Sequence, residues 1–383
     1  MIPVYQPFFT GREKEYVNQC LDSTWISSKG EFIGWFESEF AKYIGSPHAT
    51  SVCNGTVAIH LALEAVGIGP GDEVIVPTLT YVASVNTIIQ AGATPVYVDS
   101  LEHSWQIDPE DVRRKITPRT KAVMAVHLYG LPCDMDSLTR ICEEHKLLLV
   151  EDCAEGFGTY HRGRHVGTFG DIATFSFFGN KTITTGEGGM VVARSKAVIE
   201  RAYHLKNQGV SPAREYWHDV VAYNYRMTNI CAAIGLAQLE SATPIIAKKR
   251  QIADWYRAAL EGLPLKFHDE LPGTVHSYWM CSIALDAAAD RQPLREHLKA
   301  AAVETRPVFH PCHTLPHCAG EGHFPVALSL SARGVNLPSY PALTREQVEQ
   351  VCSSIAAYFQ RAAVGHATES AGTRRPAAAT SAI

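Results

Sequence analysis

The chain has 383 residues, of which 46% are hydrophobic and 19% are charged, and its formal net charge at pH 7 is −5. This is the composition of an ordinary globular protein, and a negative charge without a basic run argues against a nucleic-acid-binding surface. The N-terminus lacks an apolar signal core, no stretch approaches the roughly 20 apolar residues of a membrane helix, and the ten cysteines show no paired framework. We therefore expect a cytoplasmic protein whose length requires two lobes.

Short apolar runs alternate with helical patterns from about residue 49 to residue 240. The segments between them, such as Val57–Val66 and Met135–His145, have apolar residues at the i, i+3, i+4 spacing of a helix. That alternation predicts an α/β fold with a large, mainly parallel, seven-stranded sheet and helices on both faces. The runs expected as strands are Ala49–Val52, Glu73–Pro77, Thr94–Asp99, Lys121–His127, Leu147–Asp152, Ile172–Phe177 and Gly189–Ala193.

The pattern changes after residue 240. It predicts a smaller C-terminal α+β domain over residues 241–363, beside a large domain over residues 1–240 that includes the N-terminal segment. The tail, residues 364–383, is rich in Ala, Ser, Thr and Gly without an apolar period, which predicts disorder. The expected elements of the smaller domain are a long helix, a strand and two more helices: Ala242–Leu260, near Tyr278–Leu285, near Pro293–Ala302 and near Arg345–Arg361.

The first motif with chemical meaning is Asn54-Gly55-Thr56, which lies between an expected strand and an apolar helix. The start of a helix presents unpaired main-chain N–H groups, and these groups together with the helix dipole suit a phosphate. A simple capped turn explains the same three residues. The motif alone leaves both interpretations open.

Two further motifs follow later strands. The run from Leu147 ends in Glu151 and Asp152, at the carboxyl edge where open α/β sheets bind ligands, and an acid there can hold a cationic nitrogen or cap a helix. Lys181 lies four residues beyond another strand, in a loop rich in Gly and Thr. A lysine in an apolar pocket has a lowered pKa and can attack a carbonyl, whereas most loop lysines are solvated.

Taken together, the three motifs suit one cofactor. Pyridoxal phosphate (PLP) needs a phosphate cradle, a lysine that binds it covalently and a carboxylate beside its pyridine nitrogen. All three candidate sites follow strands of one sheet and are expected at the same edge. We therefore expect a PLP enzyme with Lys181 and Asp152 as its catalytic residues.

The chain resembles the DegT/DnrJ/EryC1/StrS family of sugar-nucleotide aminotransferases, which have the PLP fold type I. The resemblance runs from Pro3 to about Phe359, nearly the whole chain. It is highly specific, because five motifs occur in the family's order: Asn54–Thr56, Pro77–Asn86, Glu151–Glu155, Ser176–Gly189 and Tyr225–Gln238.

The resemblance implies roles for individual residues around the cofactor. Lys181 matches the Schiff-base lysine, Asp152 the partner of the pyridinium nitrogen, and Tyr81 the aromatic residue that stacks on the ring. Glu155 stands where the family often has a glutamine near the ring hydroxyl, which leaves that contact in doubt. The residues that match the phosphate cradle are Gly55, Thr56 and Ser176.

Other implied roles concern the partner subunit and the substrate. Asn229 matches a residue that reaches the phosphate of the neighbouring subunit, which implies a homodimer with shared active sites. Arg226 is either a sugar-phosphate ligand or an ordinary ion-pair partner. His310 opens a segment placed at the mouth of the active site, where family members bind the sugar nucleotide.

The implied activity is transamination of a nucleotide-linked keto sugar. The lysine at position 181 favours transamination over the dehydration carried out by relatives with histidine there. The sequence TITTGEGG after the lysine is similar to that of enzymes that act at C4 rather than C3. We expect GDP-4-keto-6-deoxymannose and glutamate as substrates, with another nucleotide-linked 4-keto or 3-keto sugar as the alternative.

Several rival interpretations remain open. His310, Cys312, His313, His317, Cys318 and His323 are all potential metal ligands, although their spacing fits no standard zinc pattern. A PLP-fold regulatory protein without catalysis is a third possibility. His127, just past a strand end, lines the site or packs beneath it. The run Lys248-Lys249-Arg250 is expected on a solvated helix face.

Overall fold

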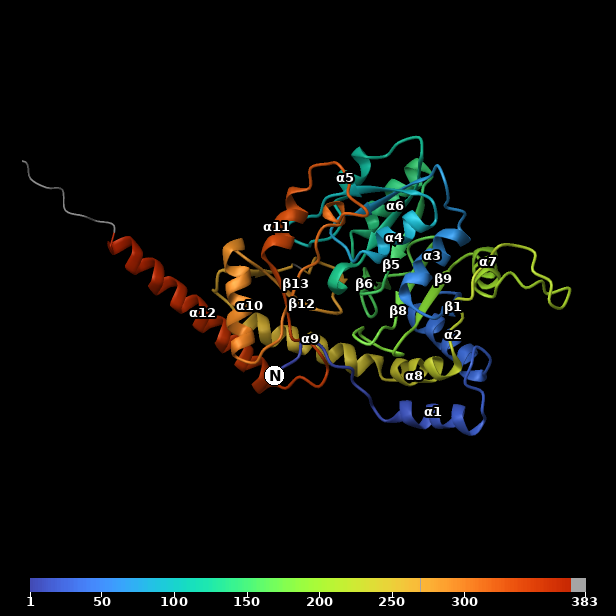
Figure 1. Cartoon of the computed structure of the whole chain (residues 1–383), viewed down its shortest axis with the longest axis horizontal. Coiled ribbons are helices and arrows are strands. Elements are labelled where there is room, and N and C mark those ends of the chain that lie inside the picture. The colour runs from blue at the N-terminus through green and yellow to red at the C-terminus, as the bar shows by residue number, and fades with distance from the viewer. Residues whose placement is uncertain (269, 373–383) are drawn as a thin grey trace, which may run out of the picture.

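The structure, a computed structural model, describes residues 1–268 and 270–372, with only the main chain for residues 362–372. Seven strands form the large sheet in the order β1-β9-β8-β5-β4-β2-β3 (Figure 1). Each strand begins and ends within one residue of the prediction, and the α/β fold class is confirmed. Their bounds are β1 His48–Val52, β2 Glu73–Pro77, β3 Thr94–Val98, β4 Thr120–Val126, β5 Leu148–Asp152, β8 Ile172–Ser176 and β9 Gly189–Ala193.

Strand β9 is antiparallel to both of its neighbours, β1 and β8, whereas the other neighbouring pairs are parallel. A parallel strand needs a crossover connection, usually a helix, on one face of the sheet. The segment between β8 and β9 contains no helix and returns directly, so β9 pairs in the opposite direction. This returning loop carries Lys181.

Helices cover both faces of the sheet, because alternate strand residues point to opposite sides. In β2, Val74 and Val76 pack into the core beneath one set of helices, and Ile75 into the core on the other side. The first set is α3 Gly55–Ala65, α4 Ala83–Gln90 and α7 Lys196–Lys206. The second is α2 Glu31–Ile44, α5 Pro109–Arg114, α6 Met135–His145 and α8 Asn229–Glu240, with α1 Arg12–Asp22 packed on α8.

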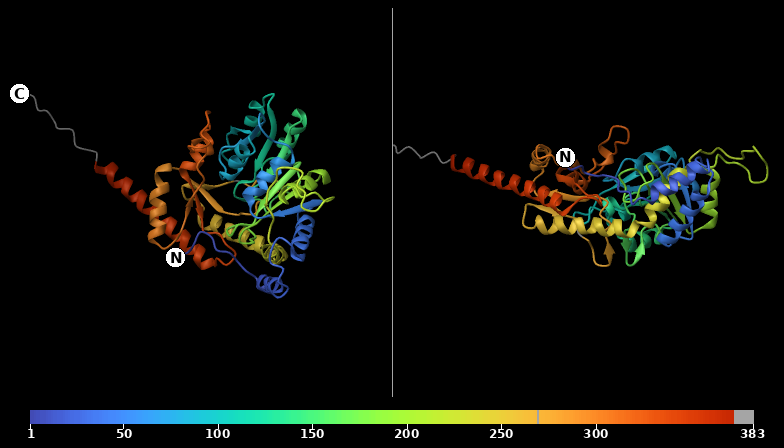
Figure 2. Two further views of the ribbon diagram at one scale, coloured as in Figure 1. Left: turned by 45° about the vertical axis from the view of Figure 1, so that its right-hand side comes forward. Right: turned by 90° about the horizontal axis from the view of Figure 1, so that it is seen from below.

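The second lobe is built on a four-stranded antiparallel sheet in the order β10-β12-β14-β13. The long helix α9 runs along one side of the molecule to this lobe (Figure 2). The strands are β10 Leu265–Phe267, β12 Cys281–Leu285, β13 Arg306–Pro307 and β14 Gly334–Leu337. The helices are α9 Ala242–Ala259, α10 Arg291–Ala300, α11 Pro325–Arg333 and α12 Arg345–Gly372.

Short elements complete the fold. A small three-stranded sheet has the order β11-β6-β7 and joins the loop after β5 to the start of the second lobe. Its strands are β6 Tyr160–His161, β7 Arg164–His165 and β11 Thr274–Val275. Three single-turn helices are η1 Leu128–Gly130, η2 Ala288–Asp290 and η3 Cys312–Thr314.

Both ends of the chain differ from the expected domain division. The N-terminal segment, expected in the large domain, pairs with the second lobe: Ile2 forms a bridge with Val303 and packs into that lobe's core. Helix α12 continues to Gly372, past residue 364 where a disordered tail is expected, and projects from the body (Figure 1). Residues 373–383 of that tail lie outside the described residues. The boundary at residue 240 stays a prediction.

No single described helix is both long and apolar enough to cross a membrane. The consecutive helices α8 and α9 reach that length and apolarity only as a pair, and they are bent by 63° at the break between them.

Candidate active site

The polar residues singled out in the sequence gather along one edge of the large sheet. Strands β1, β2, β4, β5 and β8 are parallel to one another, and their carboxyl ends therefore meet at this edge. Ligands of open α/β sheets bind there because loops from several strands converge.

The Asn54 motif makes a capped helix start beside Ser176. The Asn54 side chain accepts a hydrogen bond from Val57 N at 2.9 Å, so the capping interpretation holds. The cap leaves the N–H groups of Gly55 and Thr56, in the first turn of α3, without intrahelical acceptors. A Cβ atom on Gly55 would lie 2.6 Å from Ser176 Cβ, so the helix start and the end of β8 touch at this point. The arrangement suits an anion, so capping and phosphate binding are compatible here.

Lys181 is not a solvated loop lysine, because its side chain is only 13% exposed. Its Nζ lies 3.9 Å from Glu155 Oε1 and 3.9 Å from the ring centroid of Trp279. Burial lowers the pKa of this amine, and the nearby carboxylates of Glu155 and Asp152 oppose that shift. A lowered pKa increases the neutral fraction of a buried amine, and the neutral amine is the form that acts as nucleophile and proton acceptor.

Asp152 ends β5 and is 5% exposed. Its Oδ2 accepts a hydrogen bond from Ser84 Oγ at 2.8 Å and its Oδ1 accepts one from Ala154 N at 3.0 Å. No helix follows Asp152 directly, because the next regular element of the described chain is the short strand β6, but the contact with Ala154 N caps the turn after β5. The two donors together fix the orientation of this carboxylate.

Glu155 lies in the loop after β5 and is almost completely buried. Its Oε2 accepts a hydrogen bond from Tyr129 N at 2.6 Å. Tyr129 has φ 58°, an unusual value for a residue with a side chain, and the hydrogen bond helps to hold it there. Burial raises the pKa of Glu155 to about 7, against the opposing effect of Lys181.

An aromatic wall connects Lys181 to Tyr81. The Trp279 ring lies parallel to Tyr129 at 6.0 Å, and Tyr129 stacks on Phe309 at 5.3 Å. Phe309 in turn lies 5.5 Å from Tyr81, whose side chain is 57% exposed. His310 follows Phe309 directly and is exposed at this end of the wall.

The segment with many His and Cys residues is attached to the end of β2. Cys312 N donates to Thr78 O at 2.7 Å, and His313 Nδ1 lies 2.7 Å from Thr78 Oγ1. His317 Nε2 contacts Asn86 Oδ1 at 2.9 Å. These side chains are thus distributed over separate partners, and within the described chain no three of the segment's potential ligands cluster.

The two residues expected to serve a neighbouring subunit or the substrate differ in their surroundings. Asn229 is 2% exposed, accepts a hydrogen bond from Phe32 N at 3.1 Å and donates one to Trp25 O at 2.7 Å. Its amide therefore hydrogen-bonds to the main chain of its own subunit, and its contact with a neighbour's phosphate stays a prediction. Arg226 is half-buried, pairs with the end of β1 and donates to Asn224 Oδ1 at 2.9 Å. It makes no ion pair among the described residues.

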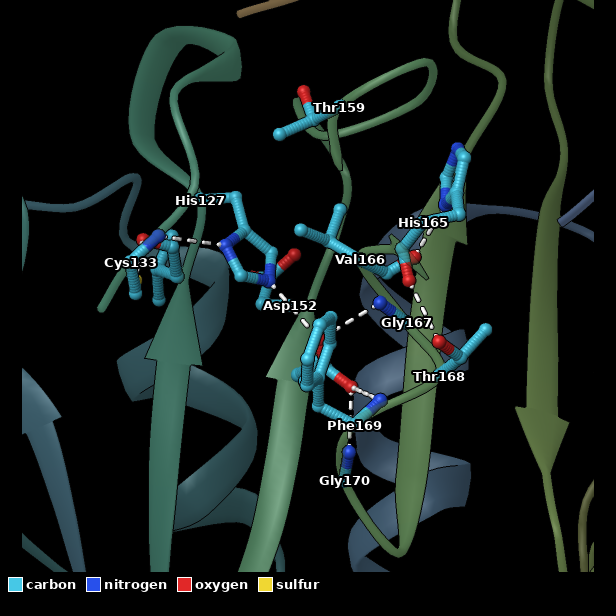
Figure 3. A network of polar contacts seen from close by, with 12 residues as sticks. His127, Cys133, Asp152, Thr159, His165, Val166, Gly167, Thr168, Phe169 and Gly170 are labelled. Atoms are coloured by element: carbon cyan, nitrogen blue, oxygen red, sulfur yellow. Dashed lines mark hydrogen bonds and ion pairs between the residues drawn. The ribbon is translucent and has the colours of Figure 1, made fainter. Parts of the chain in front are cut away.

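His127 belongs to a fully buried network beneath the site (Figure 3). Its Nδ1 accepts from Cys133 N at 3.2 Å, which leaves Nε2 as the donor toward Glu151 Oε2 at 3.2 Å. The Glu151 carboxylate also accepts three main-chain N–H groups, those of Gly167, Phe169 and Gly170. Of the two roles left open for His127, packing beneath the site is the one that the structure supports.

Three residues close to this site escaped the sequence interpretation. Tyr129, Trp279 and Tyr5 lie outside the recognised motifs and carry no distinctive local pattern. Ser84 lies within the quoted segment Pro77–Asn86, in the first turn of α4, and that segment was the available signal.

The residues present fit PLP. The helix start at Gly55 offers main-chain donors for a phosphate where a side chain would not fit, Lys181 is a buried amine, and Asp152 is an oriented carboxylate. These are the three groups that the cofactor requires.

Comparison with known proteins agrees with this site. The family model described as DegT/DnrJ/EryC1/StrS aminotransferase family matches residues 8–356. GDP-perosamine synthase from Escherichia coli O157:H7 is 56% identical over 359 residues, 94% of this chain and 98% of that protein. The crystal structure of the aminotransferase TlmJ from Streptoalloteichus hindustanus superposes with a TM-score of 0.91 at 30% identity, covering 95% of this chain and 100% of that one. The PLP form of the sugar aminotransferase Spr1654 from Streptococcus pneumoniae gives 0.89 at 26% identity, covering 94% and 99%. The chain therefore belongs to the DegT/DnrJ/EryC1/StrS aminotransferase family and is a PLP-dependent aminotransferase that acts on a sugar nucleotide.

Proposed function

We propose that this enzyme transfers the amino group of glutamate to C4 of GDP-4-keto-6-deoxymannose, giving GDP-perosamine and 2-oxoglutarate. The observation that carries the proposal is the 56% identity to a GDP-perosamine synthase over almost the full length of both chains. The buried Lys181, close to two carboxylates, supports transamination rather than a regulatory role without catalysis.

PLP, when bound, supplies an aldehyde that condenses with amines and a ring that accepts the electron pair of a broken C–H bond. Lys181 is proposed as the residue that binds it covalently and, once released, removes and returns protons at Nζ. Burial favours the neutral amine, which is the form that accepts a proton. The same Nζ serves both halves of the reaction, with glutamate and with the keto sugar.

The two carboxylates take different tasks. Asp152 is proposed to hold a proton on the ring nitrogen, since an adjacent negative charge favours the protonated form of a base. The hydrogen bonds from Ser84 and Ala154 keep the carboxylate in one orientation for that task. Glu155 is proposed to face the ring hydroxyl, where its raised pKa of about 7 lets it accept or donate a hydrogen bond.

The remaining side chains are proposed to bind the cofactor and substrate. Gly55, Thr56 and Ser176 form the phosphate cradle, and the exposed Tyr81 ring stacks on the cofactor ring. His310, at the outer end of the aromatic wall, and Arg226, without an ion-pair partner among the described residues, are the proposed sugar-nucleotide contacts.

We further propose that the enzyme is a cytoplasmic homodimer with active sites shared between subunits. All ten cysteines are free, as expected in a reducing compartment. Trp25 and Trp35, 56% and 48% exposed, flank Asn229 in an open hollow of about 710 Å³, and exposed aromatic clusters mark protein interfaces. Because Asn229 binds the main chain of Trp25 and of Phe32, three residues before Trp35, we infer that it also helps to shape this interface.

Two experiments test the proposal. Purified enzyme is offered a panel of 4-keto and 3-keto nucleotide sugars with glutamate, and each product is identified by mass spectrometry and NMR. If the enzyme prefers another nucleotide base or a 3-keto sugar, the proposed substrate is wrong. If no sugar is turned over, the regulatory alternative is supported. Borohydride reduction followed by peptide mapping should place a pyridoxyl group on Lys181, and its recovery on any other lysine would refute the site.

A further inference from the structure

The main-chain carbonyls of Asn180 and Lys181 both accept hydrogen bonds from residues far away in the sequence. Trp279 Nε1 donates to Asn180 O at 2.7 Å, and the Tyr5 hydroxyl donates to Lys181 O. Trp279 lies two residues before β12 of the second lobe, and Tyr5 belongs to the N-terminal segment that pairs with that lobe. The two carbonyls that flank the lysine Cα are therefore held from outside the large sheet that carries the loop.

Trp279 also contacts the amine itself. Lys181 Nζ lies 3.9 Å from the Trp279 ring centroid, a cation–π geometry that favours the charged amine. The parallel packing of Trp279 on Tyr129 and its bond to Asn180 fix the ring in this position. One tryptophan thus determines where the loop lies and what the lysine ammonium faces.

The Tyr5 hydroxyl is delivered by a short strap with its own anchors. Ile2 N donates to Ala302 O at 2.7 Å, and Val4 N donates to Glu304 Oε2 at 3.0 Å. Val4 O accepts from Ser339 N at 3.0 Å. These bonds attach residues 2–4 to the second lobe. They therefore fix the position of the next residue, Tyr5, relative to the loop that carries Lys181.

We propose that Tyr5 and Trp279 are positioning residues of the transamination: they place Lys181 Nζ from the second lobe, and the Trp279 ring stabilises its protonated form. The proposal rests on the proposed function of Lys181. The groups that face Nζ are the carboxylates of Glu155 and Asp152 and the Trp279 ring, and Tyr5 binds the main chain behind it. Tyr5 contacts only the main chain of Lys181, whereas the Trp279 ring also contacts Nζ but has no group there that exchanges a proton with it.

Two substitutions of Trp279 separate the effect of its N–H donor from the effect of its ring. Trp279→Phe keeps a ring and removes the N–H donor, whereas Trp279→Leu removes both. In the holoenzyme, we expect the pH midpoint of the visible cofactor band to fall by about one unit or less in Trp279→Leu. Trp279→Phe should show a smaller shift but a loss of kcat similar to that of the leucine variant, since both lose the bond to Asn180 O.

Tyr5→Phe removes one hydroxyl and no packing volume. We expect kcat to fall by about tenfold, because small misplacements of a reacting group slow chemistry strongly, with KM for both substrates nearly unchanged. The matched control is Tyr256→Phe. Tyr256 is buried in the same lobe, and its hydroxyl donates to Pro338 O at 3.0 Å. Tyr256→Phe therefore shows what the loss of a similar hydrogen bond does to stability and rate when the bond lies away from Lys181.

The outcomes separate the inference from the proposed function. A wild-type enzyme without a visible band or turnover defeats the proposed function and the inference with it. If the wild type is active but Tyr5→Phe and Trp279→Phe have the same kcat, KM and band midpoint as Tyr256→Phe, only the inference is wrong. Should Trp279→Leu fail to fold, as judged by its melting temperature, the phenylalanine variant and Tyr5→Phe still decide the matter.

Discussion

Replacing Glu155 by glutamine removes a charge beside Lys181 while keeping the size of the side chain and an acceptor for Tyr129 N. The two charged atoms are 3.9 Å apart, and at an effective dielectric constant of about 20 unit charges at that distance attract by about 4 kcal/mol. Burial already lowers the pKa of Lys181, and the Glu155 carboxylate opposes that shift, so Glu155→Gln should lower the pKa of the amine further.

The assay is competitive acetylation of the cofactor-free, full-length protein across a pH series, with the label on the Lys181 peptide quantified by mass spectrometry. The difference from wild type should be largest above pH 7, because the pKa of Glu155 is about 7 and its charge is lost in more acidic solution. Glu73→Gln is the control, since Glu73 is buried but pairs with Arg119 at the opposite end of β2. A midpoint for Lys181 that stays constant or rises in Glu155→Gln would show that this ion pair does not control the amine.

Three further changes test the site and the core. Asp152→Asn should still bind PLP but slow α-proton removal by about 10²-fold, or about 3 kcal/mol, in single-turnover absorbance with glutamate; a near-normal rate would contradict its assigned role. Gly55→Ala brings a Cβ within 2.6 Å of Ser176 Cβ and should weaken PLP binding about tenfold by equilibrium dialysis, unlike Gly34→Ala, where the space is open. Lys249 is fully buried and its pKa falls from 10.5 to about 7, so the unfolded chain binds its proton more tightly. The unfolding free energy should therefore rise with pH between 7 and 10.5, by up to about 5 kcal/mol from this group, and fall as pH drops. Lys249→Met should flatten that slope in urea titrations, and an unchanged slope would contradict the burial argument.

Strands and motifs were predictable because each depends on neighbours in the sequence. A buried parallel strand appears as a short apolar run between turn signals, and the carboxyl end of such a strand places the next few residues at the ligand edge. Asp152, Lys181 and the Asn54 turn all follow this rule. The direction of β9 cannot be predicted from its own apolar run. It depends on the absence of a crossover helix in the described loop between β8 and β9.

Contacts between distant segments left no comparable signal. Tyr5 and Trp279 lie 176 and 99 positions from the carbonyls they bind, and only the packing of the second lobe brings them to the lysine loop. The prediction that Lys249 lies on a solvated helix face was wrong. Three successive basic residues suggested a solvated face, but each helix residue turns by about 100°, and the middle one points inward to Ser339 O at 2.8 Å.

The proximity of Glu155 and Lys181 has a physical consequence for the chemistry. Burial penalises the charged form of each group, so it raises the pKa of the carboxyl group and lowers that of the amine. The two pKa values approach one another, and the free energy needed to move a proton between the two side chains falls accordingly. A glutamine at position 155 would accept the hydrogen bond from Tyr129 N but hold no proton. We therefore expect Glu155 to provide a second group that can hold a proton beside Lys181, which a glutamine could not do.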